Sequence, residues 1–134
     1  MTGVQTCALP IYTIYMAEAG PVPHLAQNGK VVSLTPGSAE ATEVASGASL
    51  LVGVNFGPGG LYALSQGPGV PGAVPGSPAQ PNSGALVRAN SDGTFTFLVD
   101  QLDLPVSFDI IGTTAYVVTL TGDVLKISGA LVPK

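Results

Sequence analysis

Apolar residues recur at every second position through the C-terminal half of the chain. In the segment 84–129, Phe95, Phe97 and Val99 fall on one side of an extended backbone, and the residues between them fall on the other. Alternation of this kind among aromatic and β-branched residues is typical of half-buried β-strands. The segment has no helical period, so the pattern predicts an all-β architecture.

Pairs of turn-forming residues separate the predicted strands. Asp92-Gly93 is expected to supply the positive φ angles of a tight hairpin, so strands 85–90 and 94–99 should pair antiparallel. The final unit is expected to contain only two strands. The strand 115–120 follows the turn Gly112-Thr113, and the strand 124–127 follows the turn Gly122-Asp123.

An earlier part of the chain repeats this pattern without a gap. Residues 42–64, TEVASGASLLVGVNFGPGGLYAL, align with residues 96–118, TFLVDQLDLPVSFDIIGTTAYVV. Repeats of about this length are typical of β-propeller blades or solenoid units, in which neighbouring units bury each other's apolar faces. The matched pairs are Thr42 with Thr96, Val44 with Leu98, Val54 with Phe108, Asn55 with Asp109, Phe56 with Ile110, Tyr62 with Tyr116 and Leu64 with Val118.

Strands are also expected in the N-terminal half, over 12–19, 30–34 and 42–45. A helix over 38–48 is an alternative, because Ser38 is a suitable cap and alanine and glutamate favour helices, but the repeat argues against it. Residues 66–83, QGPGVPGAVPGSPAQPNS, lack the regular glycine spacing of collagen. They are predicted to form an exposed, mobile loop inserted between two strands of one blade.

Residues 1–11, MTGVQTCALPI, resemble the translation of a sequencing-library adapter whose GTG serves as the start codon. They are expected to be a disordered artefact, which removes Cys7 and with it any disulfide or thiol chemistry. The native N-terminus would then be missing. A secretory signal peptide is the alternative, but this segment has no positively charged start.

The composition argues against some kinds of binding partner but says little about an activity. The 134 residues are 46% hydrophobic and carry a net charge of −4, with charged residues at 9%. An ordinary soluble domain has about 25% charged residues. The chain shows no basic patch and no apolar run long enough to cross a membrane, so neither nucleic acid binding nor a membrane span is expected.

Three segments together resemble the ScyD/ScyE family of exported bacterial β-propellers. These segments are YMAEAG at 15–20, GALVRANSDGTFTFLVDQLDLP at 84–105 and IIGTTAYVVTLTGDVLKI at 110–127. The resemblance covers most of 12–129 and only the C-terminal portion of the longer family members. It implies about two and a half four-stranded blades of a six-bladed propeller, with residues 130–134 as a tail. It also implies an extracytoplasmic location, either periplasmic or secreted.

Four polar residues are candidates for a binding site. A sugar-lactonase-type propeller holds a divalent cation with Glu, Asn and Asp, so Glu18, Asn55 and Asp109 are candidate Ca²⁺ ligands and His24 a candidate general base. The structural alternative is that Glu18 and His24 cap strand ends in solvent, while Asn55 and Asp109 lie on polar strand faces.

Three functions are consistent with the sequence. The favoured one is a non-catalytic exported propeller without a cofactor that binds or scaffolds an unknown protein or small-molecule partner. The alternatives are a metal-dependent propeller enzyme and an extracellular structural or matrix protein. No nucleophile motif or phosphate-binding glycine loop is present in the sequence. A chain of this extent is also expected to expose an apolar blade face and to aggregate.

Overall fold

The computed structural model describes residues 12–25 and 28–131. Residues 1–11, including Cys7, and the last three residues of the predicted tail lie outside this range. The ten strands are β1 (Ile14–Glu18), β2 (Lys30–Leu34), β3 (Thr42–Ser46), β4 (Leu51–Gly57), β5 (Gly60–Ser65), β6 (Gly84–Ala89), β7 (Phe95–Leu102), β8 (Pro105–Ile111), β9 (Thr114–Thr119) and β10 (Val124–Ser128).

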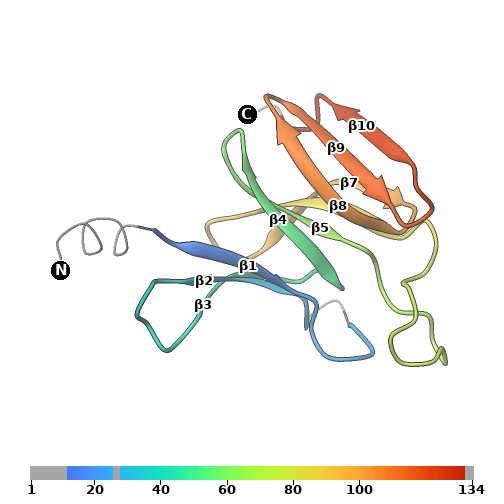
Figure 1. Ribbon diagram of the computed structural model, residues 1–134, viewed down its shortest axis with the longest axis horizontal. Coiled ribbons are helices and arrows are strands. Elements are labelled where there is room, and N and C mark those ends of the chain that lie inside the picture. The colour runs from blue at the N-terminus through green and yellow to red at the C-terminus, as the bar shows by residue number, and fades with distance from the viewer. Residues whose placement is uncertain (1–11, 26–27, 132–134) are drawn as a thin grey trace, which may run out of the picture.

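The strands form three antiparallel sheets, each built from strands that are consecutive in the chain (Figure 1). The first sheet has the order β1-β2-β3, the middle sheet β4-β5-β6-β7, and the last sheet β8-β9-β10. The described residues contain no α-helix, so the predicted all-β architecture is confirmed. The helical alternative for 38–48 is wrong, because Thr42–Ser46 is a strand paired with β2.

The hairpin between β6 and β7 confirms the predicted pairing but corrects its turn. The backbone N–H of Gly93 donates to the Asn90 carbonyl at 3.1 Å, and the N–H of Asn90 donates to the Thr94 carbonyl at 2.8 Å. Only Gly93 has a positive φ, at 87°, whereas Asp92 does not. This is a three-residue loop that ends in a left-handed glycine, so one glycine is sufficient to close it.

The last sheet has three strands, not the two expected from the sequence. Its additional strand β8 begins at Pro105, at the first position of an edge strand, where the missing N–H of proline is tolerated. The register supports the alignment of the repeats. Asn55 lies opposite Tyr62 in the middle sheet, and the matched Asp109 lies opposite Tyr116 in the last sheet.

The two inner strands of the middle sheet, β5 and β6, are buried on both faces. We call the face of the middle sheet that packs against the last sheet its front face; it carries Tyr62, Leu64 and Leu86, which are fully buried with Phe108 and Val117. The opposite, back face packs against the first sheet. It carries Leu61, Ala63, Ala85 and Val87, which are buried with Val31 of β2 and with Ala48 and Leu51.

Strands β5 and β6 therefore send alternate side chains into two different cores, as the period of two along a β-strand requires. Leu131, close to the C-terminus, is 1% exposed and completes the core on the front side. The middle sheet is thus the best-buried part of the fold.

Candidate functional site

A large hollow in the described part of the chain lies where three connections meet. These are the segment between β1 and β2, the segment 47–50 between β3 and β4, and the long segment 66–83 between β5 and β6. The pocket has a volume of about 550 Å³. Its lining residues are Pro23, His24, Leu25, Gly47, Ala48, Ser49, Ser65, Gly67, Pro68, Gly69, Val70, Pro71, Gly72, Ala73, Ser83 and Phe97.

Segment 66–83 is held in place by its own hydrogen bonds. The side-chain amide of Gln66 donates to the Pro105 carbonyl at 3.3 Å, and its Oε1 accepts from the N–H of Ala79 at 3.3 Å. The Gln80 side chain donates to the Gly69 carbonyl at 3.2 Å, beside an isolated β-bridge between Gly69 and Ala79. This segment therefore forms a defined wall of the pocket.

Glycine brings the two main walls together. A Cβ atom at Gly69 would lie 2.8 Å from the carbonyl oxygen of Pro23, closer than side-chain carbons approach in proteins. Gly67 has a φ of 113°, and a Cβ there would lie 2.1 Å from Oγ of Ser83. Glycine tolerates both the close approach and the positive φ. The pocket thus depends on a sequence in which glycine alternates with proline.

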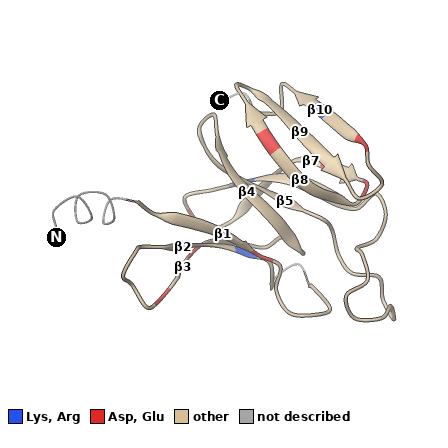
Figure 2. Ribbon diagram, viewed as in Figure 1, with Lys and Arg blue, Asp and Glu red and all other residues tan. Residues whose placement is uncertain are grey.

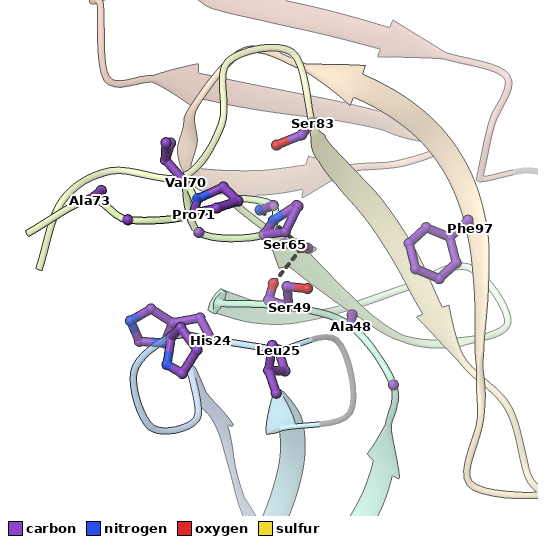
Figure 3. A pocket seen from close by; sticks show the side chains of 16 residues that line it. His24, Leu25, Ala48, Ser49, Ser65, Val70, Pro71, Ala73, Ser83 and Phe97 are labelled. Atoms are coloured by element: carbon purple, nitrogen blue, oxygen red, sulfur yellow. Dashed lines mark hydrogen bonds between the residues drawn. The ribbon is translucent and has the colours of Figure 1, made fainter. Parts of the chain in front are cut away.

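His24 lines the pocket across from Val70 and Pro71, with Ser49 and Ser65 to one side (Figure 3). Its φ of 60° is unusual for a residue with a side chain, and its N–H donates to the Pro21 carbonyl at 2.8 Å. The turn therefore fixes the imidazole at the pocket wall. Nδ1 of His24 is buried and has no hydrogen-bond partner among the described residues.

The hydroxyls of two serines that line the pocket, Ser65 and Ser83, are already engaged in hydrogen bonds. Oγ of Ser65 donates to the Ser49 carbonyl at 2.5 Å and accepts from the N–H of Gly67 at 3.2 Å (Figure 3). Oγ of Ser83 donates to the Gln80 carbonyl at 2.6 Å. The bonds of Ser65 join the 47–50 connection to the start of segment 66–83. The His24 imidazole has unused hydrogen-bonding capacity at Nδ1.

The described lining residues include no Asp, Glu, Lys or Arg. Charged residues are instead scattered over the three sheets (Figure 2). Proline rings, aliphatic side chains and the ring of Phe97 form most of the surface. Small-molecule sites are typically apolar clefts of about 300–1,000 Å³ with a few placed polar groups. The pocket has this size and this chemistry.

Of the four predicted site residues, only His24 lies in this pocket. Glu18 ends β1, where its Oε2 is 3.8 Å from Nζ of Lys30 on the neighbouring strand. The two side chains are 36% and 40% exposed, so this is a surface ion pair.

Asn55 and Asp109 occupy matched positions but have different surroundings. Nδ2 of Asn55 donates to the Phe108 carbonyl at 2.8 Å and so joins the middle sheet to the last sheet. Asp109 is exposed, and its Oδ1 accepts from the N–H of Ile110 at 2.9 Å. Within 12–25 and 28–131, no three His, Cys, Asp or Glu side chains form a group that could hold a metal ion.

Sequence reasoning did not identify Ser49, Ser65 or Phe97 as pocket residues. Their positions depend on contacts between segments distant in the chain, and nothing in the local sequence indicates such contacts. The alternation of proline and glycine in 66–83 was the one available signal, because it permits a loop to pack closely against another segment.

The described residues also include no helix with the length and apolar character that a membrane crossing requires. The chain matches no protein-family model, no curated protein and no solved structure in the comparisons made.

Proposed function

We propose that this chain is part of a non-catalytic β-propeller of the ScyD/ScyE type that binds a small ligand. The stacking of three antiparallel sheets in chain order supports the proposal, because propeller blades follow one another in this way. Strand β4 has the same place in the middle sheet that β8 has in the last sheet. An extracytoplasmic location is part of the proposal and rests on the family resemblance.

The pocket beside segment 66–83 carries the binding part of the proposal. Two loops, the 47–50 connection and β7 converge on it, and its size suits a small molecule. Three proline rings and the exposed ring of Phe97 offer flat apolar surfaces. A flat, mainly apolar ligand fits these walls, and one polar group on that ligand would bond to the imidazole of His24, which lines the pocket.

The test is a titration of the 134-residue protein with 1-naphthol, a flat apolar molecule with one hydroxyl group. Saturable binding is expected, and Phe97→Leu should weaken it about three- to tenfold, the usual worth of an aromatic contact. Phe56→Leu is the matched control, because Phe56 is also exposed but lies outside the pocket lining. The absence of saturable binding, or an equal loss in both variants, would contradict the proposal.

The polar contact is tested separately with naphthalene, which lacks the hydroxyl group. Naphthalene should bind about two- to tenfold more weakly than 1-naphthol, the range expected for one hydrogen bond. In His24→Leu the two molecules should bind equally, since the imidazole is removed. If the preference for 1-naphthol survives in this variant, His24 is not the polar partner.

A further inference from the structure

The last sheet exposes one face, and the equivalent face of the middle sheet is covered. In the last sheet, we call the face that points away from the middle sheet the front face. It carries Tyr116, Val118 and Val124, together with Asp109 and Lys126. Val118 is 38% exposed and Val124 is 65% exposed. The opposite face of the same sheet packs on the middle sheet through Phe108 and Val117 and their neighbours.

Position by position, this surface matches the buried front face of the middle sheet. In the middle sheet Tyr62 pairs with Arg88 and Leu64 pairs with Leu86. In the last sheet Tyr116 pairs with Lys126 and Val118 pairs with Val124. Aromatic, aliphatic and basic residues therefore recur in the same arrangement.

The two surfaces differ in what covers them. Tyr62, Leu64 and Leu86 are 0% exposed because the last sheet lies on them. Nothing among the described residues lies in the same place on the last sheet. Its front face thus has the chemistry of a sheet-to-sheet interface.

The first sheet exposes the complementary surface. Tyr15, Ala17 and Val31 point toward the middle sheet, so the alternate residues of β1 point away from it. Ile14 is 56% exposed and Met16 is 43% exposed on this outer, back face. In both interfaces within the chain, the front face of one sheet meets the back face of the next.

We propose that a second copy of this chain continues the stack, with the front face of the last sheet of one copy packed on the back face of the first sheet of another. The contact continues the two interfaces that the chain already contains. It is heterologous, because each copy contributes one face of each kind, so association runs head to tail. The inference does not depend on ligand binding or on closure of a propeller ring.

Two variants separate the faces. Val124→Asp places a charge on the front face of the last sheet, and Ile14→Asp places one on the back face of the first sheet. Val74→Asp is the matched control, because Val74 is 77% exposed in segment 66–83, away from both faces. Molar mass is measured for each protein by light scattering during gel filtration, over a dilution series.

The wild type and Val74→Asp are expected to associate, while Val124→Asp and Ile14→Asp are monomers. A mixture of these two monomers should form a heterodimer of twice the monomer mass, because Val124→Asp keeps an intact back face and Ile14→Asp keeps an intact front face. This rescue requires a front-to-back contact.

Three results would overturn the inference. A wild type that is monomeric throughout would assign the front face to another partner or to a further segment of a longer chain. Dimers of Ile14→Asp alone would indicate a front-to-front contact. Association weakened equally by Val74→Asp, without a defined heterodimer in the mixture, would indicate unspecific aggregation.

Discussion

Asp92 lies in the turn between β6 and β7, where its carboxylate accepts two hydrogen bonds from Thr94. The hydroxyl of Thr94 donates to Oδ1 at 2.6 Å, and its N–H donates to the same oxygen at 3.0 Å. Asn90 joins the network by donating to the Thr94 hydroxyl at 3.0 Å. The turn is therefore fixed by side chains as well as by the left-handed Gly93.

The hydrogen bonds from the Thr94 hydroxyl and N–H lower the pKa of Asp92 below its ordinary value of 3.8. The folded-state pKa is depressed, so the stabilising effect of the ionised carboxylate is present above pH 3.8. It is lost as the pH falls through the folded-state pKa. An NMR titration of the Asp92 carboxyl carbon should show a midpoint below 3.8, and Thr94→Val should raise it. A midpoint that does not change in Thr94→Val would contradict this origin of the shift.

The turn also shows what a short stretch of sequence can predict. Asp92-Gly93 correctly predicted the hairpin and its antiparallel pairing, because the turn is a local structure. The φ of Asp92 was predicted incorrectly, since the loop has three residues and needs only one left-handed position. His24 was proposed from its residue type, whereas its place in the pocket depends on contacts with distant loops.

At the scale of elements, glycine sets how closely neighbouring sheets approach. Gly84 begins β6, and a Cβ there would lie 2.5 Å from the ring carbons of Pro105 in β8 and 2.9 Å from the Ser65 carbonyl oxygen. A Cβ at Gly53, in β4, would lie 3.5 Å from the Phe108 ring, an ordinary contact. The two glycines therefore have different structural requirements.

Gly84→Ala is expected to lower the free energy of unfolding by about 1–3 kcal/mol, the usual cost of overpacking. Gly53→Ala should change it by less than about 1 kcal/mol, because the added methyl group fits and alanine restricts the unfolded chain. Urea unfolding at one fixed protein concentration measures both. Equal effects of the two substitutions would show that Gly84 does not limit the approach of β6 to β8.

Some strands and loops were predicted from the sequence and others were not. The period-two pattern and the turn residues correctly placed most of the strands, and the repeat correctly favoured the strand β3 over a helix. Strands β4 and β8 were not predicted, because Gly53 in β4 and Pro105 at the start of β8 weaken the local strand signal. The hydrogen bonds of segment 66–83 were not predicted either, because one joins Gln66 to the distant Pro105 and another joins Gln80 to Gly69 across the loop.

At the scale of the whole molecule, the fold is a stack of three sheets with the middle sheet covered on both faces. The repeat predicted this mutual covering, because each unit was expected to leave one apolar face for its neighbour. How many sheets would close the ring of the proposed β-propeller depends on the full protein. The outer faces of the first and last sheets are where the stack can grow.

Amide hydrogen exchange tests this stack most directly. It is best measured by mass spectrometry in the Val124→Asp variant, so that association does not protect the outer faces. The slowest exchange is expected in β5 and β6, which lie inside the middle sheet, and faster exchange in the edge strands β1 and β10. Exchange in β5 and β6 as fast as in β1 and β10 would contradict a core centred on the middle sheet.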